Sequence, residues 1–291
     1  MLKLLITGSN GQLGQSFQQE ITNFPICSAV FFDKAMLDIC KPMQIRKVVS
    51  EVKPDFIINC AAYTAVDEAE NNIFLAQKIN EEGPAHLGKI AADLNIPVIH
   101  FSSDYVYHNH SNKPLKEGDP TNPVGIYAQT KLAGEKQLLH HQPHSYILRT
   151  SWVFSPFGKN FLKSMHRLAS QKKVIRVVSD QIGAPTYAPF MAKDVLQMAQ
   201  QIYANPNKFK SLAGIYNYCP EGVCSWYDFA YFIFKYLKVS TELIAIPSEA
   251  YPTPVSRPPF SVMNTQKIKS AFGLKLKHWD EGLLHCLKAM N

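Results

Sequence analysis

A glycine-rich turn directly after the first apolar run is the feature that most constrains this chain. Residues 2–7 have the length and apolar character of a buried strand, and helix periodicity starts at Gln12. The turn permits a tight reversal at Gly8, close approach of a pyrophosphate at Gly11, and close packing of helix on strand at Gly14. It therefore predicts a dinucleotide site at the helix start, formed by Gly8, Asn10, Gly11, Gln12, Leu13 and Gly14.

The first 150 residues alternate apolar, strand-like runs with segments of helical period. We expect strands at 2–7, 29–32, 55–60, 97–101 and 146–149. We expect helices from 12 into the low twenties, over 42–52, over 71–94 with an interruption at Gly83-Pro84, and over 126–141. Strands with little polar alternation, separated by helices, form a parallel sheet that is covered on both faces. The sequence predicts an α/β fold with a doubly wound, Rossmann-like parallel sheet, and residues 1–150 as the dinucleotide-binding domain.

The pattern after residue 150 is less regular and predicts a smaller C-terminal lobe. Helices are expected at 159–170, 190–203, 225–237 and 280–290, with a strand at 174–178. The proline-rich stretch 247–259 also carries aromatic and apolar residues, which indicates an ordered loop. We expect residues 151–291 to form mainly a substrate-binding lobe, with some segments, about 174–205, returning to the first domain.

Charge and cysteine content limit the classes of partner and ligand that we expect for this protein. The 30 basic and 23 acidic side chains give a net charge of +7, which suits nucleic acid or a small anionic substrate. The basic residues are scattered, so we favour a phosphate-bearing small molecule and expect no nucleic-acid partner. The six cysteines form no C-x-x-C pair, which argues against disulfides and structural zinc. No apolar run approaches 18 residues and no signal-like cleavage site follows the start, so we expect a cytoplasmic protein with no membrane partner.

An acidic residue follows the second expected strand, where the ribose of a dinucleotide would lie. Asp33 can accept hydrogen bonds from the adenosine ribose, which favours NADH, whereas Lys34 can pair with the 2′-phosphate of NADPH. The expected cofactor is therefore NADPH or NADH, and the two side chains leave the preference open. Asp38 and Ile39 stand where an adenine ring would be held, although a helix N-cap is an equal alternative for Asp38.

Tyr127 and Lys131 are spaced i,i+4 in the helix expected over 126–141, so they share one helix face. A lysine ammonium near a phenol favours the phenolate, so we expect Lys131 to lower the pKa of Tyr127. Ser103 ends a strand at the sheet edge where ligands bind in open α/β folds. The three side chains predict a catalytic group in which a phenol gives its proton to an oxygen that gains negative charge during hydride transfer.

Several blocks of the sequence resemble the extended short-chain dehydrogenase/reductases. Besides the glycine turn, these are Asn59-Cys60-Ala61-Ala62-Tyr63, Ser102-Ser103-Asp104-Tyr105-Val106-Tyr107 and Tyr127-Ala128-Gln129-Thr130-Lys131. More narrowly, the chain is similar to the dTDP-4-dehydrorhamnose reductase family. That similarity lies in residues 62–70, 149–154, 180–186 and 251–258, so it covers nearly the whole chain.

The resemblance implies reduction of the 4-keto group of a dTDP-4-keto-6-deoxy sugar to give dTDP-L-rhamnose. Tyr127 would be the general acid, Lys131 would orient the nicotinamide ribose, and Ser103, where the family commonly has threonine, would hold the keto oxygen. The cofactor would also contact Ala61, Ala62 and Tyr63. The substrate would meet Ser103, Asp104, Tyr105, Trp152 and Arg257. Core packing stays open for Trp152, and a solvated loop position stays open for Arg257.

Some members of this family hold magnesium at a subunit contact, through acidic side chains that include one just past the glycine turn. In this chain no acid follows Gly14 until Glu20, and residues 187–190 contain none. A hard divalent cation usually needs at least one or two carboxylates, so we expect no metal site. We expect a monomer or a weak homodimer.

Two other functions stay open. The reductase family is similar to a non-catalytic subunit that binds methionine adenosyltransferase, and the chain could instead be another nucleotide-sugar reductase, an epimerase or a dehydratase. The presence of Ser103, Tyr127 and Lys131 favours an enzyme. Stoichiometric consumption of reduced cofactor would separate a reductase from an epimerase, which recycles its cofactor, and from a binding subunit.

Overall fold

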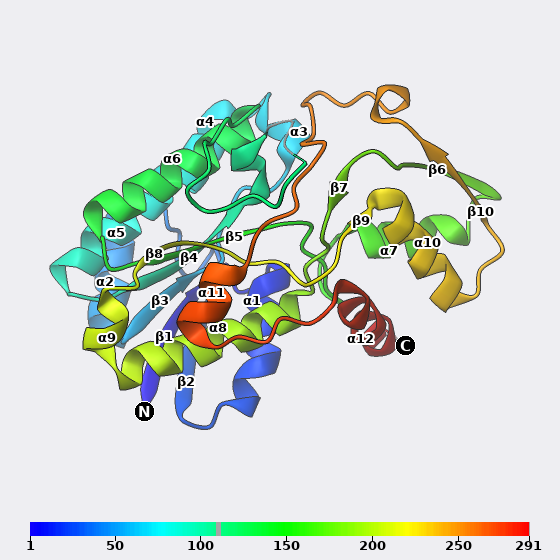
Figure 1. Cartoon of the computed structure of the whole chain (residues 1–291). Coiled ribbons are helices and arrows are strands. Elements are labelled where there is room, and N and C mark those ends of the chain that lie inside the picture. Colours follow the sequence, from blue (N-terminus) through cyan, green and yellow to red (C-terminus); the bar gives the residue numbers. More distant parts are fainter. Residues whose placement is uncertain (109–111, 291) are drawn as a thin grey trace.

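A six-stranded parallel sheet forms the centre of the larger of two lobes (Figure 1). The computed structural model describes residues 1–108 and 112–290. Strand order in the sheet is β2-β1-β3-β4-β5-β8, and every neighbouring pair is parallel. The strands are β1 (Leu2–Thr7), β2 (Cys27–Phe32), β3 (Phe56–Asn59), β4 (Val98–Ser103), β5 (Tyr146–Thr150) and β8 (Gly214–Asn217). The predicted α/β fold with a doubly wound parallel sheet is confirmed.

Helices cover both faces of this sheet, which explains why its strands are apolar throughout. Leu4 and Ile6 of β1 pack in one core, whereas Leu5 between them packs in the core on the opposite face. The first face is covered by α1 (Gln12–Glu20), α8 (Ala188–Ala204) and α11 (Gln266–Phe272) (Figure 1). The second face is covered by α2 (Pro42–Val52), α5 (Gly83–Asp93) and α6 (Ile126–His141).

The helical segment before β4 differs from its prediction at Gly83-Pro84. The chain stays helical through α4 (Ile73–Gln77), the π-helical turn η2 (Lys78–Glu82) and α5, and a short α3 (Val66–Ala69) precedes them. Pro84 has no N–H to donate to the Asn80 carbonyl four residues back, so the ladder widens there instead of ending. That carbonyl faces α6, where a Cβ on Gly134 would lie 1.9 Å from its oxygen.

The smaller lobe is built mainly from the C-terminal half of the chain. Its sheets pair β6 (Val174–Val178) with β10 (Glu242–Ile246), and β7 (Ile182–Gly183) with β9 (Cys224–Ser225). Its helices are α7 (Phe161–Ala169), α10 (Trp226–Leu237) and α12 (Trp279–Met290). They share an apolar core that includes Phe154, Phe229 and Leu283. Within the segment 174–205, β6 lies in this lobe, whereas α8 packs against α1 of the larger lobe.

The remaining elements are short connections. They are η1 (Ile21–Asn23), η3 (Asp104–Tyr107), α9 (Pro206–Lys210) and η4 (Ser248–Ala250). Within residues 1–108 and 112–290, none of the helices combines the length and apolar character needed to cross a bilayer.

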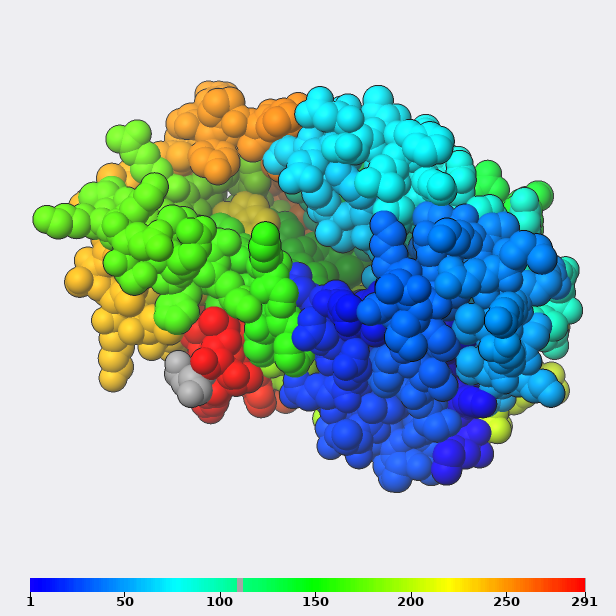
Figure 2. Space-filling model, turned by 180° about the vertical axis from the view of Figure 1, so that it is seen from behind, coloured from blue at the N-terminus to red at the C-terminus, as the bar shows by residue number. Residues whose placement is uncertain are grey.

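Strand order reverses at β1, because the chain passes from β1 to β2 on one side and later places β3 on the other. In open α/β sheets this switch point opens a crevice outside the carboxyl ends of the strands. Gly8 follows β1 and Cys60 follows β3, so both lie at this crevice. The space-filling view shows a hollow between the larger lobe, blue to cyan, and the green and orange parts of the chain (Figure 2).

Candidate active site

The glycine turn brings the ends of β1 and β3 into very close contact. Gly8 has a φ of +66°, and a Cβ there would lie 2.6 Å from the backbone nitrogen of Ala61. At Gly14 a Cβ would lie 2.4 Å from the Gly8 carbonyl oxygen, so α1 can pack on the turn only through a glycine. Gly11 is the N-cap of α1 and offers no side-chain cap, which leaves the helix start accessible to an anion.

A pocket opens beside this turn and extends toward the end of β2. Its lining includes the predicted cofactor residues Gly8, Asn10, Gly11, Asp33, Lys34, Asp38, Ile39, Ala61 and Ala62. The lining is completed by four residues that the motifs do not indicate, namely Leu37, Cys40, Cys60 and Ile79. The cavity volume is about 270 Å³, close to the lower end of the size range of small-molecule sites, and the pocket is partly open to solvent. Its glycine cradle and its carboxylate beyond the second strand fit a dinucleotide.

Asp33 is held in place at the mouth of this pocket. Its Oδ2 accepts from the Asn10 side chain at 3.0 Å, and its Oδ1 accepts from the backbone N–H groups of Ala35 and Met36. Lys34 is exposed beside it. The N-cap alternative for Asp38 is wrong, because its carboxylate accepts from Cys40 N while Lys41 is the N-cap of α2.

Six predicted cofactor residues do not line the pocket, namely Gln12, Leu13, Gly14, Tyr63, Tyr127 and Lys131. The side chain of Gln12 points to the smaller lobe, where its Oε1 accepts from Asn160 at 2.8 Å and from Ser155 at 3.0 Å. Leu13 packs on the apolar core beneath the sheet. The backbone of Tyr63 is held by the buried side chain of Asn80. Its Nδ2 donates to Tyr63 O, and its Oδ1 accepts from Tyr63 N.

The predicted catalytic group meets at the carboxyl end of β4. The phenol of Tyr127, in the first turn of α6, lies beside the Ser103 side chain, which acts to lower the pKa of the phenol. Ser103 Oγ in turn donates to Asp104 Oδ1 at 3.1 Å and accepts from Tyr105 N at 3.2 Å. The ring of Tyr105 packs edge-on against the ring of Tyr127, with centroids 5.7 Å apart. The end of β4 and the turn that follows it therefore place the Ser103 hydroxyl and the Tyr105 ring beside the phenol of Tyr127.

The expected lowering of the Tyr127 pKa is wrong for the protein without cofactor. Burial of the phenol raises the pKa of Tyr127 to about 12, the neighbouring Ser103 side chain lowers it in part, and the nearby Asp104 carboxylate adds to the rise. Tyr127 is therefore fully protonated at neutral pH. The ammonium of Lys131 does not offset the burial, because its Nζ donates to the Phe101 carbonyl oxygen at 2.6 Å.

Lys131 lies deeper than the phenol, against the middle of β4. The side chain is buried, and its Nζ lies 3.5 Å from Nε2 of the buried His100. Burial lowers the pKa of Lys131 to about 8, and the Glu135 carboxylate one turn along α6 acts in the opposite direction. A lysine with this pKa changes from ammonium to neutral amine just above neutral pH.

Two residues outside the predicted group start helix α6 at the correct place. Its first amide, Ile126 N, donates to Glu70 Oε1 at 2.7 Å, which puts a negative charge at the positive end of the helix. The preceding Gly125 has a φ of +81°, and a Cβ there would lie 2.6 Å from Val255. Glu70 and Gly125 therefore fix the first turn of α6 and, with it, Tyr127.

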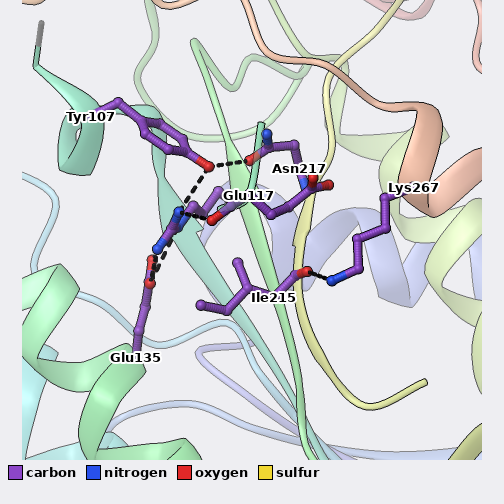
Figure 3. Close-up of polar contacts among 7 residues, drawn as sticks. Tyr107, Glu117, Glu135, Ile215, Asn217 and Lys267 are labelled. Carbon is purple, nitrogen blue, oxygen red and sulfur yellow. Dashed lines mark hydrogen bonds and ion pairs between the residues drawn. The ribbon is translucent and has the colours of Figure 1, made fainter. Parts of the chain in front are cut away.

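A buried network holds the rest of α6 against the sheet (Figure 3). Arg149 of β5 donates to Glu135 through Nη2 at 2.6 Å and through Nε at 3.0 Å. Its Nη1 donates to the Tyr107 hydroxyl at 2.7 Å, and that hydroxyl donates to Asn217 Oδ1 of β8 at 2.9 Å. The loop residue Glu117 joins through its carbonyl, which accepts from Arg149, and its carboxylate, which accepts from Asn217 N. The network links α6, β5 and β8 beneath the catalytic group.

Arg257 and Trp152, the predicted substrate contacts, have partners within the protein. Arg257 pairs with Asp67, and its guanidinium lies 5.9 Å from the ring centroid of Tyr105. Trp152 has a φ of +49° and stacks on Trp226 with ring centroids 3.7 Å apart. Arg257 thus reaches the catalytic group through Tyr105, and the aromatic stack anchors Trp152 in the smaller lobe.

No group of three or more His, Cys, Asp or Glu side chains is placed to hold a metal ion within residues 1–108 and 112–290. Glu20, the first acid after the glycine turn, is half-buried at the end of α1. The absence of a metal requirement therefore stays a prediction.

Known proteins are similar to this chain along nearly its whole length. The family model of the RmlD substrate binding domain matches residues 2–291. A dTDP-4-dehydrorhamnose reductase of Aggregatibacter actinomycetemcomitans is 38% identical over 290 residues, which cover 97% of each chain. The chain belongs to the RmlD family. The family membership indicated by the sequence motifs is confirmed.

Solved structures of RmlD-family proteins share the fold. A dTDP-4-dehydrorhamnose reductase from Clostridium acetobutylicum is 34% identical, with a TM-score of 0.92 and 99% of each chain covered. Another from Bacillus anthracis, solved in complex with NADP, is 32% identical with a TM-score of 0.92 and covers 99% of this chain and 100% of its own.

Proposed function

We propose that this RmlD-family protein reduces the 4-keto group of dTDP-4-dehydrorhamnose to give dTDP-L-rhamnose, with NADPH or NADH as the reductant. The observation that carries the proposal is the placement of Tyr127 and Ser103 together at the end of β4, where the Tyr127 ring packs against Tyr105, whose N–H donates to Ser103 Oγ. The adjacent strands β3 and β1 end at the pocket that fits a dinucleotide. Relatives named dTDP-4-dehydrorhamnose reductase, one of them solved with NADP, support the substrate and the cofactor.

Tyr127 serves as the proton donor in this proposal. Its pKa of about 12 keeps the proton on Oη until an oxygen beside it gains negative charge. The nicotinamide, when bound, supplies the hydride to the carbonyl carbon. Ser103 Oγ can turn from Asp104 toward the carbonyl oxygen and donate a second hydrogen bond there. The two hydroxyls together polarise the carbonyl and protonate the alkoxide.

Lys131 orients the ribose of the cofactor and restores the proton of Tyr127. Its side chain leaves α6 on the same face as Tyr127, one turn further along. Because the pKa of Lys131 is about 8 and that of Tyr127 about 12, a proton on Nζ moves downhill to the phenolate after each turnover.

Residues 151–291, apart from segments such as α8 that pack on the larger lobe, form the substrate-binding lobe in this proposal. Trp152 offers its ring to the sugar, and Arg257 offers its guanidinium to the diphosphate of the nucleotide. Asp104 and Tyr105 border the same space beside Ser103. The protein works in the cytoplasm as a monomer or weak homodimer, without nucleic acid, and sedimentation equilibrium tests the oligomeric state.

The absorbance of the reduced cofactor tests the reaction. The protein is mixed with dTDP-4-dehydrorhamnose and either NADPH or NADH, and with the corresponding UDP-linked 4-keto sugar as a control substrate. We expect one reduced cofactor to be consumed for each dTDP-L-rhamnose formed. Sugar conversion without net consumption would mean an epimerase, and no conversion at all would mean a binding subunit.

A further inference from the structure

His100 is a buried histidine that the proposed reaction does not use, yet it touches the lysine of the catalytic group. It lies in the middle of β4 and is 1% exposed. Its Nε2 faces Lys131 Nζ at 3.5 Å, and its Nδ1 faces the side-chain nitrogen of Asn59 at 3.0 Å. What His100 does to Lys131 depends on which ring nitrogen carries the proton.

The orientation of the Asn59 amide settles that question. Asn59 Oδ1 accepts from the Thr7 hydroxyl at 2.7 Å and from the backbone N–H of Ala61 at 3.2 Å. A backbone N–H can only donate, so the oxygen of the amide must stay on that side. The NH₂ group of Asn59 therefore points at His100 Nδ1, which must accept, and the single ring proton belongs on Nε2.

The ring carries only that one proton. Burial and the charge of Lys131 hold the pKa of His100 well below its usual range, although the Asn59 backbone carbonyl acts in the opposite direction. A neutral ring with Nδ1 unprotonated presents an N–H, rather than a lone pair, to Lys131. An amine at Nζ can accept from this N–H, whereas an ammonium meets a second donor.

We propose that His100 is a positioning residue that disfavours the charged form of Lys131, by pointing at Nζ an Nε2–H that Asn59 and Thr7 hold in place. The proposal rests on the proposed role of Lys131 in proton transfer. The groups that face Nζ are the Phe101 carbonyl and His100 from β4 and the Glu135 carboxylate from α6. The Phe101 carbonyl and the Glu135 carboxylate favour the ammonium form of Lys131, and His100 opposes them.

Two measurements on the protein without cofactor or substrate test this. Long-range ¹H–¹⁵N NMR of the unmodified protein, labelled at histidine, reports the tautomer of His100. We expect a proton on Nε2, and a proton on Nδ1 would overturn the proposal. The chain has 10 histidines, so the ring signal of His100 is assigned by its loss in His100→Phe, and the measurement does not depend on enzymatic activity.

The second measurement titrates Lys131 by NMR of ¹³Cε-labelled lysine, with its signal assigned by its loss in Lys131→Arg. His100→Phe keeps the ring volume and removes the N–H, so we expect the midpoint of Lys131 to rise by about 0.5–1 pH unit. A titration midpoint of Lys131 that falls or stays unchanged would contradict the proposal. If His100 instead presented an Nε2 lone pair, it would stabilise the ammonium, and removing it would lower the midpoint. Ile99→Val, a change in the core beside His100, serves as the control and should leave the midpoint in place.

The pH dependence of turnover separates this inference from the proposed function. If Lys131 acts in proton transfer, the alkaline limb of the kcat profile should move upward in His100→Phe by the same amount as its titration. A shifted titration with an unmoved kcat profile would support the effect of His100 on Lys131 and count against the proposed role of Lys131. A variant that is only less stable would shift neither the titration midpoint of Lys131 nor the alkaline limb of the kcat profile.

Discussion

Arg257 and Asp67 form an ion pair in which Nη2 lies 2.6 Å from Oδ2, although 190 residues separate them in the chain. Asp67 belongs to α3 of the larger lobe, and Arg257 to the proline-rich stretch that joins the smaller lobe to α11. The other two atoms of the pair, Arg257 Nη1 and Asp67 Oδ1, are buried without a hydrogen-bond partner among residues 1–108 and 112–290. The pair therefore ties the two parts together and leaves one donor and one acceptor for a ligand.

Arg257→Ala should raise the KM for the nucleotide sugar and leave the KM for the cofactor unchanged. Truncating a charged hydrogen-bond partner costs about 1.5–3 kcal/mol, or roughly 10- to 150-fold in KM. Asp67→Asn is the matched control, because it removes the ion pair and keeps the guanidinium. We expect a much smaller rise in that variant, measured by steady-state kinetics. Equal effects in the two variants would mean that Arg257 only supports the fold.

Arg149→Met should destabilise the fold strongly, because it leaves the Glu135 carboxylate buried and unpaired. Both side chains are at most 3% exposed, and breaking such a pair costs about 3–5 kcal/mol. The exposed pair Arg46–Asp93 is the control, and Arg46→Ala there should cost no more than about 1 kcal/mol. Urea unfolding measures both free energies. Similar losses for the two variants would show that the network in Figure 3 does not hold α6.

Asp104 should make the free energy of unfolding fall between about pH 4 and pH 6. Burial raises the pKa of Asp104 from 3.8 to about 6, and the nearby side chains of Ser261 and Ser103 lower it in part. The folded protein holds this proton more tightly than the unfolded chain, so the stabilisation is complete below pH 4 and is lost as the pH rises through 6. The loss is on the order of 3 kcal/mol. Urea unfolding of Asp104→Asn should lack this step, and an identical step in the variant would assign it to another group.

The alternation of buried strands and helices made the larger sheet predictable, because strands covered on both faces are apolar throughout. Strand β8 was missed because it has only four residues and owes its place at the sheet edge to pairing with β5. The helix through Pro84 was missed as a continuous segment because proline usually ends a helix. Here Gly134 of α6 leaves room for the Asn80 carbonyl, which has no N–H of residue 84 to accept from.

The site was predictable where its chemistry depends on local spacing, as for the glycine turn and the pair of Tyr127 and Lys131. Contacts between residues far apart in the chain were not. Glu70 caps α6 from 56 residues away, and nothing in the pattern near residue 70 indicates that role. The raised pKa of Tyr127 was missed for a related reason, since burial by neighbouring elements outweighs a lysine on the same helix.

Activity should survive removal of divalent metal ions. In the proposed mechanism Tyr127, Lys131 and Ser103 supply the proton and polarise the carbonyl, and hydride transfer adds no requirement for a cation. We expect full turnover after exhaustive dialysis against EDTA, and no change in sedimentation when magnesium is added back. Activity that is lost on dialysis and restored by magnesium would show that Glu20 or another acid binds a catalytic or structural ion.

Tyr127→Phe tests the central claim most directly, because it removes only the hydroxyl that we propose gives the proton. A positioned general acid contributes on the order of 10²–10⁴-fold to the rate. Single-turnover rates with dTDP-4-dehydrorhamnose, together with the dissociation constant of the reduced cofactor, separate chemistry from binding. We predict that the variant binds the cofactor with nearly unchanged affinity and loses at least about 10²-fold in rate. A variant that reduces the sugar at close to the parent rate would contradict Tyr127 as the proton donor.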